Sequence, residues 1–277
     1  MKDPKYRLLV LDLDGTLTNN RKEITPHTER VLLEAQKQGL IIVLASGRPT
    51  FGIAPIADRL HLAEYGGYIL AYNGGQIIRW SDRKVIYENM LDPAVLPYFY
   101  ERAKSNGFEI LSYAGDDVVS EDPDNQYVAY ECFLNKMQGR KVENFLDVIN
   151  GPVPKCLIVG EPERLVHLEK EMAERLSETN SVYRSEAFFL ELVPKGIDKA
   201  ACLAVLLEHL GYSREEMIAC GDGYNDLTMI QFAGLGVAMA NAKEEVKAVA
   251  DHITVSNEEE GVALVVEQFY MHPQSSK

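Results

Sequence analysis

The sequence has few cysteines and a shortage of positive charge, and each shortage excludes a class of protein. Its 277 residues include four cysteines, with no C-x-x-C pair and no histidine cluster beside them. This spacing predicts reduced, buried thiols rather than disulfides or a zinc site. Lysine and arginine number 28 against 42 aspartates and glutamates, a formal net charge of −14. So acidic a chain repels a phosphate backbone, which argues against general nucleic-acid binding.

Long apolar runs are also missing. The apolar stretch at residues 8–11 ends at Asp12 and is too short for a signal peptide. The longest uninterrupted run, residues 200–207, falls far below the ~18 residues that suggest a membrane span. Hydrophobic residues make up 46% and charged residues 25% of the chain, which is an ordinary globular composition. We therefore expect a cytoplasmic protein that does not enter a membrane.

The first and last parts of the chain alternate apolar runs with helix-like segments. Buried strands are expected at residues 7–13, 40–45, 68–72, 217–220 and 235–238. Helices are expected between them at residues 26–38, 49–60, 198–210 and 226–232. Strands that alternate with helices predict a parallel sheet with right-handed crossovers.

The middle of the chain has a different pattern. Hairpins are expected at residues 76–88 and 109–120, and helices near residues 93–105, 142–148 and 162–176. Further strands are expected at residues 153–159 and 181–193. This mixture predicts an α+β insert. We expect a discontinuous α/β core at residues 1–76 and 194–277, interrupted by an insert at residues 77–193.

Two aspartates close the first expected strand. Asp12 and Asp14 precede Gly15-Thr16, and strand alternation points both carboxyl groups toward the carboxyl edge of the sheet. Open α/β folds bind their ligands at that edge. One carboxylate can attack an electrophile such as phosphorus while the other carries a proton to the leaving group. Taken alone, an Asp-Gly turn that simply closes a strand explains the segment equally well.

Two later segments offer partners for an anion. Ser46-Gly47-Arg48 ends the second expected strand, so a hydroxyl and exposed N–H groups precede a helix. Lys199 opens another helix, where a cation is unfavourable against the helix dipole unless an anion lies nearby. Each has a simpler interpretation when taken alone, a common Ser-Gly turn in the first case and a solvated surface lysine in the second.

The most specific segment is GDGYND at residues 221–226, directly after an expected strand. Two carboxylates and an amide on a turn bracketed by glycines suit Mg²⁺, which prefers oxygen ligands. A plain turn is the alternative for Gly-Asp-Gly on its own. The chain has no G-x-G-x-x-G or Walker A string, which weakens a dinucleotide or NTPase interpretation.

In this order, the four segments resemble the DxDGT, S/T, Lys and GDGxND motifs of the haloacid dehalogenase-like (HAD) phosphohydrolase superfamily. The resemblance implies a HAD-type Rossmann-like core with a parallel sheet. The long interval between Ser46 and Lys199 is similar to the Cof-type branch, which carries an inserted α+β C2 cap domain there. YNGG at residues 72–75 and EGVA at residues 260–263 also resemble that branch.

The resemblance also implies roles for individual residues. Asp12 would be the nucleophile that forms an aspartyl-phosphate, and Asp14 the general acid–base. Phosphoryl oxygens would be held by Leu13, Ser46, Gly47, Lys199 and Asn225. The cofactor Mg²⁺ would be bound by Asp12, Asp14 and Asp222, with Asp226 acting through water or behind these ligands. Candidate substrate contacts are Arg48, Asn73 and Arg184.

The function implied is Mg²⁺-dependent hydrolysis of small phosphate monoesters, such as sugar phosphates. A phosphomutase or phosphotransferase would use the same site with a hydroxyl group in place of water. A non-enzymatic sensor on a HAD scaffold is a third hypothesis, and it predicts degraded motifs, whereas every motif position is filled here. The expected partner is a small phosphorylated metabolite, with no nucleic acid and no membrane. The sequence leaves the oligomeric state and the physiological substrate open.

Overall fold

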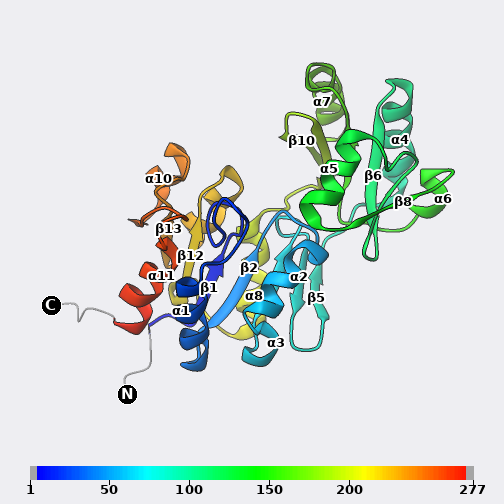
Figure 1. The fold of residues 1–277 in the computed structure, drawn as a ribbon. Helices are drawn as coiled ribbons and strands as arrows, with labels where there is room; N and C mark the ends of the chain where they lie inside the picture. The colour runs from blue at the N-terminus through cyan, green and yellow to red at the C-terminus, as the bar shows by residue number, and fades with distance from the viewer. Residues whose placement is uncertain (1–4, 273–277) are drawn as a thin grey trace. The chain divides into compact units, whose positions relative to one another are not determined.

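The computed structural model describes residues 5–272, which form two compact units (Figure 1). The first unit runs to Tyr87 and resumes at Asp198, and the second is Glu88–Ile197. The first unit is therefore discontinuous in sequence, as expected. The boundaries differ from those predicted, because residues 77–87 belong to the first unit rather than to the insert, and residues 194–197 belong to the second unit rather than to the core.

The first unit is built on a mainly parallel sheet with the strand order β14-β13-β12-β1-β2-β3-β4-β5. Its parallel strands are β1 (Leu8–Leu11), β2 (Ile41–Ala45), β3 (Tyr68–Ala71), β12 (Met217–Gly221), β13 (Leu235–Ala238) and β14 (His252–Ile253). β4 (Gln76–Arg79) runs antiparallel to β3, and β5 (Lys84–Glu88) lies at the edge. Every residue of β1 is buried, as its uninterrupted apolar run predicts for a strand covered on both faces.

Helices connect these strands in the predicted alternation. They are α1 (Pro26–Lys37), α2 (Thr50–Arg59), α3 (Leu62–Tyr65), α8 (Lys199–Leu210), α9 (Leu227–Phe232), α10 (Glu244–Val249) and α11 (Gly261–Val266), with short helical turns at Arg214–Glu216, Tyr224–Asp226 and Glu267–Met271. α1 begins as expected, because the Thr25 side chain accepts a hydrogen bond from the Thr28 N–H and Pro26 occupies the first turn. No helix within residues 5–272 is long and apolar enough to cross a membrane.

The second unit is an α+β structure, as predicted. Its sheet has the order β10-β11-β9-β6-β7-β8, formed by β6 (Glu109–Ala114), β7 (Asp117–Ser120), β8 (Gln138–Lys141), β9 (Cys156–Val159), β10 (Asn180–Glu186) and β11 (Phe189–Pro194). The helices are α4 (Leu96–Ser105), which follows a turn at Pro93–Val95, α5 (Gln126–Asn135), α6 (Phe145–Val148) and α7 (Pro162–Leu176). Phe99 of α4 and Leu168 of α7 lie with Ile158 of β9 in one buried apolar cluster.

Three local predictions need correction. The hairpin at residues 76–88 extends the sheet of the first unit, because β4 pairs with β3. The single strand expected at residues 181–193 is a hairpin, in which β10 and β11 pair antiparallel. α5 was not predicted, because the apolar residues of Gln126–Asn135 are distributed around the helix and leave no apolar stripe to recognise.

Candidate functional site

The four motif segments lie where the parallel strands of the first unit end. Asp12 follows β1, Ser46 follows β2, and Asp222 follows β12, while Lys199 is the first residue of α8. β1 pairs with β12 on one side and with β2 on the other, so these three strand ends meet at one edge of the sheet (Figure 1). The fold therefore brings together segments that are far apart in the sequence.

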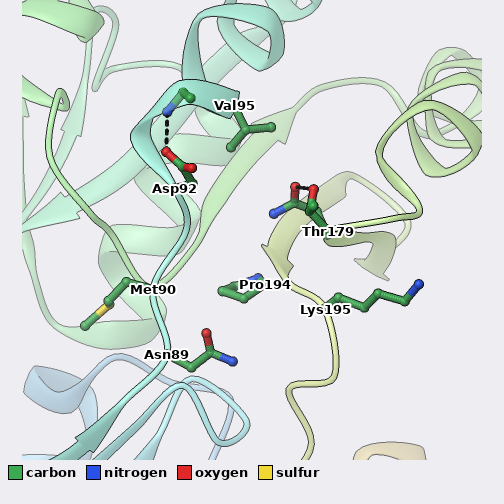
Figure 2. A pocket seen from close by; sticks show the side chains of 9 residues that line it. Asn89, Met90, Asp92, Val95, Thr179, Pro194 and Lys195 are labelled. Carbon is green, nitrogen blue, oxygen red and sulfur yellow. Dashed lines mark hydrogen bonds between the residues drawn. The ribbon is translucent and has the colours of Figure 1, made fainter.

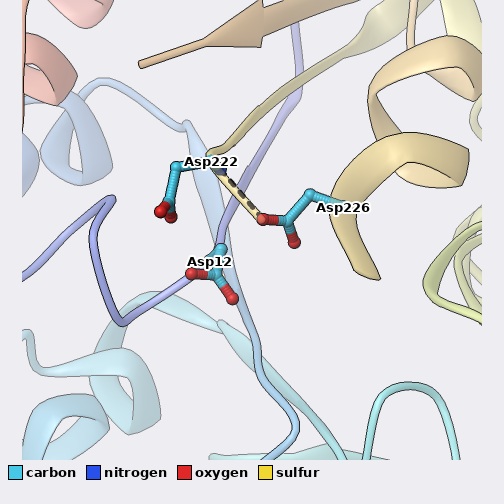
Figure 3. Close-up of side chains that lie close together, drawn as sticks. All are labelled: Asp12, Asp222 and Asp226. Carbon is cyan, nitrogen blue, oxygen red and sulfur yellow. Dashed lines mark hydrogen bonds between the residues drawn. The ribbon is translucent and has the colours of Figure 1, made fainter. Parts of the chain in front are cut away.

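Three aspartates form a cluster at this edge (Figure 3). Each of Asp12, Asp222 and Asp226 offers one carboxylate oxygen, and these oxygens all lie within 4.8 Å of one another. Asp12 and Asp226 are buried, and Asp222 is partly buried. Carboxylate oxygens at this spacing are a donor set that could hold a hard divalent cation.

Lys199 places a fully buried ammonium group against the cluster. Nζ donates to Asp12 Oδ1 at 2.7 Å, to Asp226 Oδ1 at 2.6 Å and to the carbonyl oxygen of Ala45 at 2.9 Å. Burial would lower the pKa of Lys199, but the two carboxylates outweigh it and raise the pKa above its ordinary value. All three ammonium protons are donated within the protein. To contact a phosphoryl oxygen, as the sequence predicted, Lys199 must exchange one of these bonds.

The charges of the cluster do not balance without a further cation. Three carboxylates face one ammonium, which leaves two excess negative charges when all the acids are ionised. Burial and the Asp226 carboxylate raise the pKa of Asp12 to about 8, despite Lys199. Burial raises the pKa of Asp222 to about 6, with a further contribution from Asp226. A divalent cation would compensate these charges, so the residues present fit a metal site.

Asp226 fixes the geometry of the turn that carries Asp222. Its Oδ2 accepts hydrogen bonds from the backbone N–H groups of Asp222 and Gly223, both at 2.9 Å (Figure 3). Its other oxygen is held by Lys199. Because both carboxylate oxygens of Asp226 accept hydrogen bonds within the protein, Asp226 holds the backbone of Asp222 in place.

The loop after β1 contacts the same turn. Thr16 Oγ1 donates to Asp222 Oδ1 at 2.8 Å. Gly15 has a φ of +85°, and a Cβ there would lie 2.4 Å from Asp222 Oδ2. Only glycine allows both this backbone conformation and this close approach. Thr16 is a functional residue that sequence reasoning missed, although its place in the DGT segment is a signal for it.

Asp14 has different partners from Asp12. The guanidinium of Arg48 donates from Nε to Asp14 Oδ2 at 2.8 Å and from Nη2 to Oδ1 at 2.6 Å, and Lys22 Nζ donates to Oδ1 at 2.6 Å. Burial would raise the pKa of Asp14, but these two cations outweigh it and hold the pKa below its ordinary value. Arg48, predicted to contact substrate, is therefore engaged with Asp14. Lys22 was missed, because a partly exposed lysine in a loop gives no signal in the sequence.

The remaining predicted phosphate contacts lie at the same edge of the sheet. Leu13 follows Asp12 directly and its side chain is fully buried. Ser46 is also buried, and its hydroxyl accepts a hydrogen bond from the Arg48 N–H at 3.2 Å. Asn225 Nδ2 donates to Asn73 Oδ1 at 3.0 Å, and the Asn73 carboxamide lies against Gly47. Asn73, which was predicted to contact the substrate, therefore contacts two residues that are predicted to bind phosphate, Asn225 and Gly47.

Arg184 belongs to the second unit, where its Nε donates to Glu169 Oε2 at 2.7 Å. The second unit also has a pocket of about 440 Å³ (Figure 2). Its lining residues are Asn89, Met90, Asp92, Ala94, Val95, Thr179, Asn180, Pro194 and Lys195. None of them is a predicted site residue, so the pocket adds nothing to the site at the sheet edge.

The chain is similar to known proteins over almost its whole length. Residues 9–266 match the family model of haloacid dehalogenase-like hydrolases. A haloacid dehalogenase-like hydrolase from Bacteroides thetaiotaomicron has a crystal structure with a TM-score of 0.93 and 54% identity, over 95% of this chain and 99% of that one. The 5-amino-6-(5-phospho-D-ribitylamino)uracil phosphatase YcsE of Bacillus subtilis is 27% identical over 274 residues, 98% of each chain.

The structure of the HAD subclass IIB sugar phosphatase BT4131 is also similar, with a TM-score of 0.77 and 26% identity, over 94% of this chain and 98% of that one. The family model spans both units, and the four motif segments meet at one sheet edge in the expected order. Two of the three relatives named here are phosphatases. The chain belongs to the haloacid dehalogenase-like hydrolases, in the Cof-type branch.

Proposed function

We propose that this protein hydrolyses small phosphate monoesters, such as sugar phosphates, with Mg²⁺ and through an aspartyl-phosphate on Asp12. The observation that carries the proposal is the buried group of three aspartates with Lys199 at the carboxyl edge of the sheet. The names of two relatives support the substrate class, because one is a sugar phosphatase and the other acts on a phosphorylated ribityl compound.

Mg²⁺ would be held by the side chains of Asp12 and Asp222 and by the backbone carbonyl of Asp14, with Asp226 acting through water or behind them. When bound, it would supply positive charge that screens an incoming phosphate from the Asp12 carboxylate. The buried, acid-rich cluster supports this assignment, since its excess negative charge is the size that one divalent cation neutralises. Mg²⁺ also prefers carboxylate and carbonyl oxygens.

The chemical step would then proceed from the residues around Asp12. Lys199 holds Asp12 Oδ1 and so fixes the orientation of the carboxylate. The carboxylate attacks phosphorus, the ester P–O bond breaks, and Asp14 in its protonated form gives its proton to the leaving alkoxide. Asp14 next takes a proton from water, which attacks phosphorus. The bond to Asp12 breaks, and inorganic phosphate is released.

The phosphoryl oxygens would be held by groups that converge at the sheet edge. These groups are the N–H of Leu13, the Ser46 hydroxyl, the N–H of Gly47, the Lys199 ammonium and the Asn225 carboxamide. Phosphoryl transfer depends chiefly on such positioning and on charge neutralisation. We assign the second unit the role of the C2 cap, which would supply contacts to the organic part of the ester, with Arg184 as one candidate.

A panel of phosphate esters tests this function. Sugar phosphates, nucleotides and vitamin phosphates would be incubated with the protein in Mg²⁺ or in EDTA, and inorganic phosphate would be measured. We expect release from sugar phosphates in Mg²⁺ and none above background in EDTA. Transfer of the phosphoryl group to an added sugar without release would support a phosphotransferase instead. A complete lack of reaction across the panel would contradict the enzymatic assignment.

A further inference from the structure

The turn at residues 72–75 joins β3 to β4 in an unusual backbone conformation. Tyr72 and Asn73 have φ values of 55° and 56°, so two consecutive residues other than glycine are left-handed. Asparagine tolerates this region better than most residues, whereas a bulky residue such as tyrosine rarely adopts it. Strained backbone of this kind persists where the surroundings fix it, and it often does so at functional sites.

The backbone of this turn is fixed from two sides. Tyr72 N–H donates to the carbonyl oxygen of Arg48 at 3.1 Å, and Asn73 N–H donates to that of Ser46 at 2.9 Å. On the other side, a Cβ on Gly74 would lie 2.5 Å from the carbonyl oxygen of Asp198, the residue that precedes Lys199. The turn therefore packs between the loop after β2 and the start of α8.

The side chain of Asn73 extends the same contacts to the GDGYND segment. Its Oδ1 accepts a hydrogen bond from Asn225 Nδ2 at 3.0 Å. Its carboxamide atoms lie 3.0–3.3 Å from the point where a Cβ on Gly47 would stand, so the amide rests directly on the backbone of Gly47. One side chain thus bridges two residues that the proposed function assigns to phosphoryl binding, and the turn as a whole touches three of the four motif segments.

We infer that Asn73 is a positioning residue for phosphoryl binding, which packs on Gly47 and acts by holding the Asn225 carboxamide in place. The inference rests on the proposed function and differs from the expectation that Asn73 contacts the substrate. Its acceptor oxygen is already occupied by Asn225, and its amide is packed on Gly47. A residue that acts in this way affects the binding of every phosphate ester equally, whatever the organic group.

Asn73→Gly tests the inference, because glycine adopts a φ of 56° without strain and the change removes the whole side chain, including the carboxamide. We expect KM and the inhibition constant of inorganic phosphate to rise about tenfold, with kcat changed less than about threefold. Lys136→Gly is the matched control, since Lys136 is exposed, left-handed at a φ of 55°, and located in the second unit. It should leave both constants unchanged. An Asn73→Gly protein with native constants would overturn the inference.

A double-mutant cycle with Asn225→Ala separates positioning from direct contact. If Asn73 acts through Asn225, the double variant should be little weaker than Asn225→Ala alone. Additive losses would mean that Asn73 acts independently and would overturn the inference. Calorimetric titration of the same four proteins with inorganic phosphate in Mg²⁺ repeats the cycle without catalysis. If the wild-type protein binds phosphate but hydrolyses no ester, the proposed function is contradicted. The cycle of phosphate affinities still tests the role of Asn73 in that case.

Discussion

At the scale of single residues, Asp12 and Asp14 are two positions apart and have opposite environments. Burial, followed by the neighbouring Asp226 carboxylate, raises the pKa of Asp12, whereas Arg48 and Lys22 hold the pKa of Asp14 low. Arg48 holds both oxygens of Asp14, which orients the carboxylate and favours its ionised form, so Asp14 can take up the proton that it later donates only after part of this contact is released. Under the proposed mechanism, Arg48 would bear on the acid–base step rather than on contact with the substrate.

Leaving groups of different basicity test this role for Arg48. In Arg48→Ala we expect kcat for sugar phosphates to fall roughly 10²-fold, because the Asp14 carboxyl group loses the two bonds that orient it toward the departing alkoxide, which must be protonated as it leaves. Hydrolysis of p-nitrophenyl phosphate, whose leaving group needs no proton, should fall only a few-fold. Asp14→Asn should give the same selectivity, and Lys22→Met a weaker one, because Lys22 is half exposed. Equal losses for both kinds of ester would instead place Arg48 on the phosphoryl group.

At the scale of elements, the site depends on close packing between the loops after β1 and β12. Thr16 reaches Asp222, Gly15 approaches the same carboxylate, and Asn241 Nδ2 donates to the carbonyl oxygen of Gly15 at 2.8 Å. Asn257 Nδ2 donates to the carbonyl oxygen of Thr18 at 2.9 Å. The chain after β13 therefore supports the loop that carries Asp14.

Gly15→Ala should damage both the fold and the metal site. The new Cβ meets Asp222 at 2.4 Å and the φ of +85° is unfavourable for alanine, so we expect a loss of about 2 kcal/mol or more in unfolding free energy. Magnesium affinity should fall with it. Gly211→Ala is the control, because its φ is 71° and no atom lies within 4 Å. It should cost only about 1 kcal/mol and leave magnesium binding intact. Equal losses of unfolding free energy and magnesium affinity in Gly15→Ala and Gly211→Ala would contradict the close approach of Gly15 to Asp222.

The sequence predicts these elements well where local pattern determines them. The parallel strands are uninterrupted apolar runs in the sequence. This pattern predicts that the motif segments at their ends lie at one edge of the sheet. The hairpin of β4 and β5 was assigned to the wrong unit, because its pattern predicts two paired strands but not the sheet that they extend. Two contacts of the site could not be predicted from the spacing of residues in the sequence, because they depend on the tertiary structure. These are the ion pair of Asp14 with Lys22 and the hydrogen bond from Asn225 to Asn73.

At the scale of the whole molecule, the net charge of −14 makes the binding of an anionic ester depend on a few local cations. The fold places Lys199, Arg48 and Lys22 around the aspartates at one sheet edge. Each is already paired with an aspartate, so a bound metal, as proposed, would supply positive charge that these three cations do not. This is why we expect the stability of the molecule to respond to magnesium and pH together.

Magnesium should stabilise the folded protein more as pH rises. The pKa of Asp12 is raised to about 8 and that of Asp222 to about 6, both from 3.8. Without metal, these groups favour folding below about pH 4 and lose that contribution as pH rises toward 8, because ionisation then leaves unbalanced buried charge. Magnesium requires the ionised form. We expect the increase in Tm on adding Mg²⁺ to be small at pH 5 and largest near pH 8. An increase independent of pH would contradict the cluster as the binding site.

Asp12→Asn tests the central claim most directly, measured as Mg²⁺-dependent phosphate release from the best ester of the panel. The amide is isosteric but cannot act as the nucleophile, so we predict a fall in kcat of at least about 10³-fold with an unchanged circular dichroism spectrum. Asp116→Asn, at an exposed position between β6 and β7, should retain the native rate. An Asp12→Asn protein that releases phosphate within a few-fold of the native rate would contradict the account.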